Sequence, residues 1–493
     1  MQRGYMNTHA GVLIGDPAVL VKIERLARGA RPRVVDLFSG CRGISLGFHR
    51  AGFIITAAVE LDPLAARSHA LNFHRDDPLF DAHARARDMT QTEPGAFCRE
   101  LGLGDTDEAV DVIVGGPPCQ AYARVGRAKL REIAKHPEAF KVDPRGNLYL
   151  RYLEFVRQMK PLALLMENVP DILHYGGHNV VEEMVETLDD MGYEARYSLI
   201  NSAFHGVPQL RDRVFLLAYR RELRIRPTFP RATHHMKLPS GYLGIRAVVL
   251  RYVDLLSGAG YVQADLGNES LPGPVTAQEA IEDLPPILGS SVKRGARRFG
   301  EDTWVPYHKT KEISAYAATM RQWPGFVSDG GVVDHVIRYL PRDGTIFRAM
   351  PEGAEYPEAH RVATLLFEEE ARRRGLTPQI KAWRELEREM VPPYPVNTFP
   401  NRWWKLRRDY PVRTLMAHIG KDTYSHIHYD AAQARTISVR EAARLQSFPD
   451  GFRFEGAMNS AFRQIGNAVP PLMAFALAEV MRDALASAVR RLR

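Results

Sequence analysis

The amino-acid sequence predicts an α/β protein: a doubly wound, mostly parallel sheet, accompanied by a second, irregular domain. Short apolar runs alternate with longer amphipathic stretches between Arg33 and Arg220, which is typical of repeated strand–helix–strand units. That rhythm is lost over residues 221–410, where Pro-rich joints and basic clusters take its place. A chain of 493 residues exceeds what one ordinary core supports, so we expect more than one domain.

Five apolar runs are the expected strands: residues 34–38, 54–59, 110–114, 162–166 and 214–219. Before them, Asp16-Pro17 predicts the start of a helix that runs to about Arg28, and helical patterns return at residues 438–445 and from Pro471 onward. We therefore expect four parts. An N-terminal extension (1–31) precedes a sheet domain (32–220), an irregular domain follows (221–455), and a C-terminal segment (456–493) returns to the sheet domain.

The composition is typical of a globular cytoplasmic enzyme, with 45% hydrophobic and 25% charged residues. We find neither a run of about 18 apolar residues nor a signal-peptide pattern. Three cysteines are too few for a disulfide framework and too scattered for a structural zinc site. The net charge of +8 is compatible with a polyanionic partner but does not by itself indicate one.

A nucleoside-binding edge is predicted where the first strands end. The first strand runs into Asp36-Leu37-Phe38-Ser39-Gly40-Cys41-Arg42-Gly43, the second ends at Glu60, and Asp88 follows the third unit. Glycines let the backbone approach a ligand closely, and an acidic residue at this place suits ribose hydroxyls. The spacing differs from the dinucleotide Gly-x-Gly-x-x-Gly pattern. Each residue alone is equally explained by a helix cap or a turn, and for Asp88 alone that explanation is the better one.

The run Gly115-Gly116-Pro117-Pro118-Cys119-Gln120 directly follows the fourth strand. Its glycines and prolines predict a rigid, exposed loop. A lone cysteine is usually a small buried hydrophobic residue, but one held at the carboxyl end of a strand beside a cofactor edge is a better candidate for a nucleophile.

Glu167 closes the next strand and should face the same pocket as Cys119. A carboxyl group beside a thiol would raise the pKa of the thiol. It therefore makes little sense as an activator of sulfur, but it would make sense if it bound and protonated a base ring. Arg211 and Arg213, just before residues 214–219, supply positive charge that favours a thiolate. Taken in isolation, these arginines are better explained as surface ion-pair partners.

These runs, in this order, resemble the motif series of the prokaryotic DNA cytosine-5 methyltransferase family, of the restriction-modification or phage-defence type. The resemblance covers roughly residues 32–220 and 411–475, and the ordered set is far more specific than any one motif. Besides the loops and acidic residues above, it includes Glu167-Asn168-Val169, Gln209-x-Arg211-x-Arg213, the run from Arg440 to Pro449, and Gln464-Ile465-Gly466-Asn467-Ala468-Val469-Pro470.

The resemblance implies a Rossmann-like fold that binds S-adenosylmethionine, with no metal needed. A cytosine is flipped out of the duplex, the Cys119 thiolate attacks C6, and C5 takes the methyl group. Glu167 holds N3 and the exocyclic amine, and Arg213 holds O2, with Arg211 completing the catalytic set. The implied cofactor residues are Phe38, Ser39, Gly40, Gly43, Glu60, Leu61, Asp88, Met89, Pro118, Asn467 and Ala468.

Residues 221–410, supported by the segment from Arg440 to Pro449, correspond to the family's target-recognition domain. Basic residues with aromatic neighbours suit phosphate contacts and a base-step wedge, although a solvated loop and a buried Trp pair explain them equally well. His426-x-His428 resembles a metal pair, but it lacks a third ligand. The predicted contacts with double-stranded DNA are Gln120, Tyr122, Arg297, Arg298, Arg402, Trp403, Lys405 and Arg407.

Three positions depart from the family pattern: Arg42 replaces a glycine, Ala123 a serine and Tyr122 a phenylalanine. Two rival functions remain to be weighed. An RNA cytosine-5 methyltransferase of this fold would carry a Cys-Phe-Thr run, which is lacking here, and a catalytically inactive DNA-binding relative would not need Cys119, Glu167, Arg211 and Arg213 together. We expect a nucleoid-associated monomer, with restriction or defence proteins as possible partners, and we identify no recognised DNA sequence.

Overall fold

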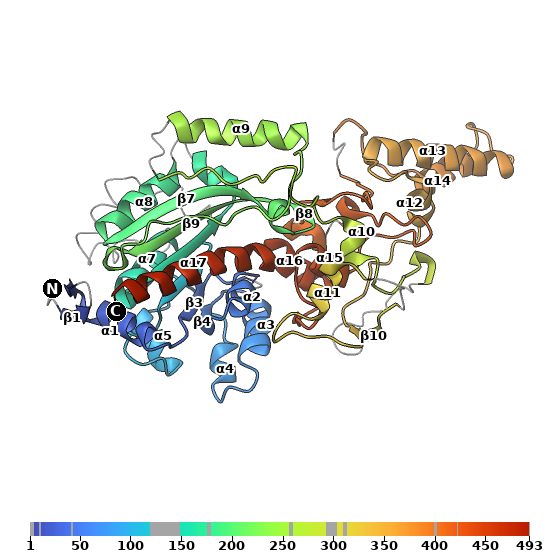
Figure 1. Cartoon of the computed structure of the whole chain (residues 1–493). Coiled ribbons are helices and arrows are strands. Elements are labelled where there is room, and N and C mark those ends of the chain that lie inside the picture. Colours follow the sequence, from blue (N-terminus) through green and yellow to red (C-terminus); the bar gives the residue numbers. More distant parts are fainter. Residues whose placement is uncertain are drawn as a thin grey trace. The chain divides into compact units, whose positions relative to one another are not determined.

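Figure 1 shows the computed structural model of the chain, which describes residues 4–8, 11–40, 43–118, 148–174, 179–255, 260–291, 303–308, 313–398, 402–421 and 423–492. The chain divides into two compact units. The first comprises residues 1–206, 211–273 and 468–493, and the second comprises residues 207–210 and 274–467.

The first unit is built on a six-stranded sheet with the order β4-β3-β5-β6-β9-β7. The strands β3, β4, β5 and β6 are parallel, whereas β9 runs antiparallel to both of its neighbours, β6 and β7. The mixed, mostly parallel sheet confirms the predicted fold class. The strand bounds are β3 Arg33–Leu37, β4 Ile54–Val59, β5 Val112–Gly115, β6 Ala163–Asn168, β7 Tyr193–Asn201 and β9 Asp212–Arg220.

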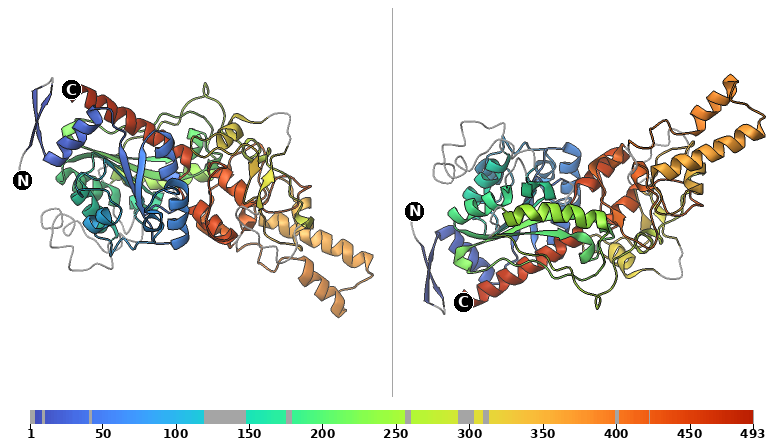
Figure 2. Two further views of the ribbon diagram at one scale, coloured as in Figure 1. Left: turned by 90° about the horizontal axis from the view of Figure 1, so that it is seen from below. Right: turned by 90° about the horizontal axis from the view of Figure 1, so that it is seen from above.

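Helices cover both faces of this sheet. Figure 2 shows α1, α2 and α17 on one face and α7 and α8 on the other. The central strands are therefore buried on both faces, which is why they are nearly continuous apolar runs; Val34 and Val35 are both 0% exposed. The helices of this unit are α1 Pro17–Ala27, α2 Gly43–Arg50, α3 Pro63–Phe73, α4 Phe80–His83, α5 Pro94–Glu100, α7 Leu148–Met159, α8 Val180–Asp190, α9 Ser240–Leu255 and α17 Pro471–Leu492.

The helix α2, which follows the first loop, packs directly on the backbone of α17. A Cβ atom added at Gly43 would lie 1.6 Å from the carbonyl oxygen of Val469, and one added at Gly47 would lie 2.4 Å from the Phe475 nitrogen. Only a residue without a side chain fits at either position. The C-terminal helix therefore fixes the position of the helix that begins directly after the predicted cofactor loop.

The N-terminal residues belong to the first unit rather than forming a separate extension. Asp16 caps α1 as predicted, accepting a hydrogen bond from Ala18 N at 3.0 Å. From α1, the Lys22 side chain is 0% exposed and donates to the carbonyl oxygens of Met159 and Lys160. Burial lowers the pKa of Lys22 to about 7. A short hairpin, β1 Gly4–Thr8 and β2 Gly11–Gly15, precedes this helix.

The second unit begins later in the chain than the sequence predicts. Residues 221–273 remain with the first unit, because Val249 and Val253 of α9 join its main core cluster. The backbone of Tyr197 in β7 also pairs with this segment, through Gly260 and Val262. At the other end, residues 456–467 stay in the second unit, where α16 packs on residues 417–420.

In its described residues, the second unit contains two-residue strands and helices that are mostly short, with α13 the exception at 18 residues. One core cluster lies around Phe347, Tyr356 and Trp403. A separate cluster joins Phe367 of α13 to Leu386 of α14. The elements are β8 Gln209–Leu210, α10 Ala277–Ile281, β10 Val305–Pro306, α11 Ala315–Arg321, β11 Gly331–Val332, α12 Gly344–Ala349, α13 Tyr356–Arg373, α14 Lys381–Met390, β12 Val412–Arg413, α15 Val439–Leu445 and α16 Met458–Asn467.

Gly47→Ala should destabilise the first unit, because the added methyl group collides with the backbone of α17. Overpacking of this kind costs about 1–3 kcal/mol. Gly244→Ala is the matched control, since nothing lies within 4 Å of its added carbon; better helix propensity should stabilise α9 by up to ~1 kcal/mol. Urea unfolding followed by circular dichroism measures both changes. An unaltered unfolding midpoint for Gly47→Ala would contradict the close contact.

Candidate active site

The carboxyl ends of four parallel strands meet at one edge of the sheet. Leu37, the last residue of β3, stands opposite both Val59 of β4 and Gly115 of β5. In turn, Gly115 stands opposite Met166 of β6. Ligands bind at this edge of open α/β sheets, and most of the predicted site residues lie on the segments that leave it.

The loop after β3 is held by Glu60 at the end of β4. Gly40 N donates to Glu60 Oε2 at 2.7 Å, and Asp62 N donates to Glu60 Oε1 at 2.8 Å. Each oxygen keeps capacity for a further hydrogen bond, such as one from a ribose hydroxyl. Phe38 has a φ of 59°, an unusual value for a residue with a side chain, and Leu61 is 66% exposed. The glycine loop after β3 and Glu60 after β4 are therefore joined by hydrogen bonds, and the side chain of Leu61, next to Glu60 in the chain, is exposed.

The remaining cofactor candidates differ in what they offer. Asp88 uses Oδ1 to accept from the nitrogen and hydroxyl of Thr90, which is the turn that the sequence offered as its alternative explanation. Met89 is 3% exposed within the main core, and its carbonyl oxygen accepts a hydrogen bond from Arg151. Ser39 N is bonded to Val59 O at 3.2 Å, and Ala468 is buried. Asn467 belongs to the second unit and is exposed.

The start of the Gly-Gly-Pro-Pro loop is anchored to the end of β6. Asn168 Nδ2 donates to the carbonyl oxygen of Pro117 at 2.7 Å in a buried hydrogen bond. A Cβ atom added at Gly116 would lie 3.0 Å from Glu167 Oε2, so glycine permits the carboxylate to approach the loop. Pro118 is exposed. Cys119, Gln120, Tyr122, Ala123 and Arg42 lie outside the described residues.

Glu167 and Arg213 form an ion pair at this edge. Arg213 Nε lies 2.8 Å from Glu167 Oε1, and the two side chains are 12% and 15% exposed. The pair forms because β9 is antiparallel to β6 and starts where β6 ends, with Val214 opposite Asn168. Sequence reasoning expected both residues in one pocket; it did not identify them as each other's partner.

Arg211 has a different environment. It is 1% exposed, and burial, reinforced by the charge of Arg213, lowers its pKa well below the usual value. Between the two arginines, Asp212 pairs with Arg246 of α9, and burial raises the pKa of Asp212 despite that partner. The described geometry thus places Arg213 beside Glu167 and Arg211 within the protein interior.

Two predicted DNA contacts in the second unit, Trp403 and Lys405, are buried rather than exposed at a surface. Trp403 is 0% exposed and stacks on Tyr424, with ring centroids 4.5 Å apart. Lys405 is 1% exposed, and its ammonium group donates to the carbonyl oxygens of Phe347 and Met350. The run from Arg402 to Arg408 resembled a DNA-binding surface because its neighbours in space cannot be read from the sequence.

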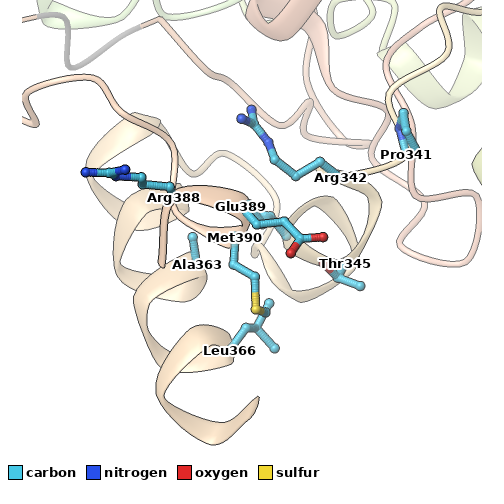
Figure 3. Close-up of a pocket in the computed structure, with 9 residues that line it drawn as sticks. Pro341, Arg342, Thr345, Ala363, Leu366, Arg388, Glu389 and Met390 are labelled. Atoms are coloured by element: carbon cyan, nitrogen blue, oxygen red, sulfur yellow. The ribbon is translucent and has the colours of Figure 1, made fainter. Parts of the chain in front are cut away.

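Other candidates in this unit remain at its surface. Arg402 lies 3.9 Å above the ring of Tyr394, and Arg407 pairs with Asp409 at 2.9 Å. Arg297 and Arg298 lie outside the described residues. Figure 3 shows an open pocket with arginine at its rim, which the sequence did not suggest; it is lined by Pro341, Arg342, Thr345, Ile346, Ala363, Leu366, Arg388, Glu389 and Met390.

The segment from Arg440 to Pro449 is buried inside the second unit. Arg440 donates to the carbonyl oxygens of Val333, Pro449 and Phe452. Arg444 pairs with both Asp283 and Asp450. Gln209 also belongs to this unit and donates to Leu445 O at 3.2 Å. These contacts hold the unit's framework together, so the motif supports the fold rather than presenting side chains at a surface.

Comparison with known proteins identifies the family of this chain. The family model for C-5 cytosine-specific DNA methylases matches residues 32–483. The chain belongs to the C-5 cytosine-specific DNA methylase family. This cytosine methylase is 37% identical over 460 residues to the assigned type II methyltransferase M.OihORF3336P of Oceanobacillus iheyensis, covering 92% of this chain and 95% of that protein. It is 30% identical to M.AgeI of Thalassovita gelatinovora, covering 92% and 100%.

A solved structure agrees with the fold of this cytosine methylase. An assigned DNA modification methyltransferase from an E. coli prophage superposes with a TM-score of 0.57 at 20% identity, covering 92% of this chain and 99% of that one. The protein is thus an enzyme of the DNA cytosine-5 methyltransferase class, for which DNA is the substrate and S-adenosylmethionine the methyl donor. Among the described residues, no helix is long and apolar enough to cross a bilayer.

Sequence reasoning missed the positioning role of Asn168. Its amide joins the candidate nucleophile loop to the strand that carries Glu167, while its own Oδ1 accepts from Val169 N at 2.9 Å. The signal was available in the residue type, because an asparagine at the end of a buried strand has both a donor and an acceptor for the loops that meet there.

Asn168→Ala should lower kcat by about a hundredfold, since small displacements of a reacting group have effects of this size. The matched control is Asn179→Ala, which removes another buried amide that donates to a tyrosine hydroxyl and caps α8; it should cost about 1 kcal/mol of stability and leave kcat unchanged. Transfer of a labelled methyl group to DNA and urea unfolding separate the two effects. Equal kcat values for both variants would contradict the positioning role.

Proposed function

We propose that this enzyme methylates C5 of a flipped-out cytosine in a specific duplex sequence, through a covalent bond between Cys119 and C6. The observation that carries the proposal is the ion pair between Glu167 and Arg213 at the carboxyl end of the sheet. It presents a carboxylate and a guanidinium beside the loop that leads to Cys119. A flipped cytosine offers matching groups, because N3 and the exocyclic amine suit the carboxyl group and O2 suits the arginine.

In the proposed reaction, the Cys119 thiolate adds to C6 and the electron pair of the C5–C6 bond moves onto C5. Glu167 protonates N3 and accepts a hydrogen bond from the amine, and Arg213 donates to O2, so that the negative charge developing on the ring is compensated. C5 would then bond to the methyl carbon as the sulfur–methyl bond of bound S-adenosylmethionine breaks, which leaves S-adenosylhomocysteine. Removal of the C5 proton restores the double bond and expels the thiolate, which leaves 5-methylcytosine and free enzyme.

The residues at the ends of β3 and β4 fit the cofactor. Glu60 is fixed by two backbone donors and keeps acceptor capacity for ribose hydroxyls. The exposed side chain of Leu61 and the ring of Phe38 offer apolar surface to adenine. Asp88 keeps Oδ2 outside its turn and is proposed to accept from the adenine amine. S-adenosylmethionine supplies an electrophilic methyl group when it is bound.

The second unit is proposed to recognise the DNA sequence, with Arg402 and Arg407 among its phosphate contacts. The loop residues Gln120 and Tyr122 and the basic residues Arg297 and Arg298 are proposed to contribute as well. We propose that the enzyme acts as a monomer in a restriction-modification or other phage-defence system. Support for that role comes from relatives that are named type II methyltransferases.

Cys119→Ser should lose methyl transfer while it still binds duplex DNA, because a hydroxyl group is a much weaker nucleophile than a thiolate. Cys98→Ala is the matched control: this cysteine is buried, and burial raises the pKa of its thiol, so its removal should leave transfer intact. Methyl incorporation and gel-shift titration measure the two properties. Full activity of Cys119→Ser would overturn the mechanism.

A duplex carrying 5-fluorocytosine at the target position should trap the enzyme, because fluorine cannot leave C5 as the proton does. With the cofactor present, denaturing electrophoresis should show a covalent complex, and peptide mapping should locate the bond at Cys119. The Cys119→Ser variant provides the negative control. If the wild-type enzyme modifies ordinary target DNA but forms no complex with the fluorinated duplex, the covalent intermediate is wrong.

Arg213→Ala should reduce turnover far more than duplex affinity, since its proposed contact is with the reacting base rather than with the phosphate backbone. A lost charged hydrogen bond in the transition state typically lowers kcat by about 10²–10³-fold. Arg221→Ala removes an exposed arginine paired with Asp189 and should change neither property. A defect of Arg213→Ala confined to DNA binding would show that its role has been assigned wrongly.

A further inference from the structure

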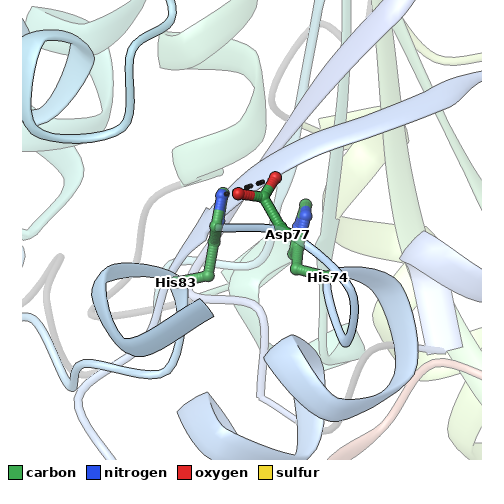
Figure 4. Close-up of side chains that lie close together, drawn as sticks. All are labelled: His74, Asp77 and His83. Carbon is green, nitrogen blue, oxygen red and sulfur yellow. Dashed lines mark ion pairs between the residues drawn. The ribbon is translucent and has the colours of Figure 1, made fainter. Parts of the chain in front are cut away.

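We propose that His74, Asp77 and His83 form a binding site for a divalent transition-metal ion, with zinc as the best match, that fixes the junction between α3 and α4. Figure 4 shows the three side chains converging from the end of α3, the following turn and α4. Each residue offers one ligand atom, and these atoms all lie within 4.8 Å of one another. The cluster is separate from the residues proposed for methyl transfer.

The distance between the His83 and Asp77 side chains suits a shared metal ion better than a direct hydrogen bond. His83 Nε2 lies 3.7 Å from Asp77 Oδ2, which is too long for a hydrogen bond. Zinc bonds to nitrogen and oxygen are about 2.0–2.2 Å, and in a tetrahedron this separates two ligand atoms by roughly 3.4 Å. Small side-chain movements would therefore bring the ligands into coordination distance.

The backbone directs Asp77 toward the two histidines. Asp77 N donates to His74 O at 3.1 Å, which closes the turn after α3. Its Oδ1 accepts from Leu79 N at 2.7 Å, and so Oδ2 is the oxygen that faces His83. The spacing His-x-x-Asp-x-x-x-x-x-His thus places three ligands around one helix–turn–helix corner.

Both histidines are buried, and the neutral form of imidazole is the one that binds metals. His74 and His83 are 8% and 6% exposed, and their rings stack with centroids 3.8 Å apart and planes within 8°. Two imidazolium rings in this arrangement would repel each other. Burial lowers the pKa of His83, and Arg87 adds to this effect although Asp77 opposes it. Coordination requires the rings to turn out of the stack so that a nitrogen of each points at the ion.

Hydrogen-bonding groups in this corner lack partners. Within the described part of the chain, His83 Nδ1 and both ring nitrogens of nearby His69 are buried without a hydrogen-bond partner, which is costly for polar atoms. His426 and His428 contrast with them, because each has a protein partner for its ring: Ser425 and the Asp430 nitrogen, respectively. The Asp77 side chain is 38% exposed, so an ion can enter from solvent and keep water as a further ligand.

An ion here would stiffen the segment that joins Glu60 to Asp88, the two acidic residues proposed to bind the cofactor. The helix α3 starts three residues after Glu60, and Arg87 N, next to Asp88, donates to Glu60 O at 2.7 Å. The metal-binding proposal itself does not depend on the proposed function. Its role is structural, because binding to the folded state alone raises stability.

Titration of the untagged, chelator-treated chain with Zn²⁺ or Co²⁺ tests the proposal. We expect one high-affinity equivalent, a visible Co²⁺ absorption band of a nitrogen- and oxygen-ligated site, and a higher Tm with Zn²⁺. Asp77→Asn keeps the acceptor for Leu79 N while removing the anionic ligand, and His83→Gln removes a nitrogen ligand. Each should weaken the affinity for Zn²⁺ by at least about tenfold and abolish the rise in Tm.

His360→Ala, which removes a histidine of α13 in the second unit, is the matched control and should keep full Zn²⁺ affinity. Circular dichroism and the metal-free Tm establish that each variant is folded. If His83→Gln does not fold, Asp77→Asn alone decides the test. Failure of the wild-type chain to bind stoichiometric Zn²⁺ would overturn the proposal. Binding that survives unchanged in folded Asp77→Asn would overturn it as well, since the ion would then lie elsewhere.

Discussion

The common register of the parallel strands is the constraint on which the candidate site depends. Because Leu37, Val59, Gly115 and Met166 stand side by side, the segments that follow them emerge at one edge. The antiparallel strand β9 starts at the same edge and brings Arg213 to Glu167. A slip of one residue in β6 would turn Glu167 to the opposite face of the sheet, and the ion pair could not form.

The candidate site also depends on the close approach of neighbouring backbone segments. Several glycines make this approach possible, which is a structural role that does not depend on the reaction. A Cβ atom at Gly115 would lie 2.3 Å from the carbonyl oxygen of Leu37, so the end of β5 could not align with β3. Gly116 makes room for Glu167, and Gly43 and Gly47 let α2 rest on α17. The glycines at positions 43, 47, 115 and 116 are therefore explained by packing, before any contact with a ligand is considered.

The sequence predicted the strands whose residues are mostly apolar, and it failed where burial depends on distant partners. β3 and β4 were evident as nearly continuous apolar runs, but β7 was overlooked because Glu194 and Arg196 interrupt its pattern. The docking of α9 through Val249 and Val253 leaves no signature in its own residues. The same reason accounts for Trp403 and Lys405, whose burial is decided by Tyr424 and by two carbonyl groups elsewhere in the chain.

The ion pair between Glu167 and Arg213 also resolves an electrostatic conflict in the proposed mechanism. A carboxylate beside a cysteine opposes formation of the thiolate, yet the same carboxylate is needed to bind the base. Arg213 compensates that charge in the absence of substrate through its bond to Oε1. In the proposed mechanism, O2 of the entering cytosine gives Arg213 a new acceptor, and the exocyclic amine gives the Glu167 carboxylate a new donor. N3 is itself an acceptor and is bound once Glu167 carries a proton. Each member of the ion pair thus has a hydrogen-bonding partner on the base while the thiolate attacks.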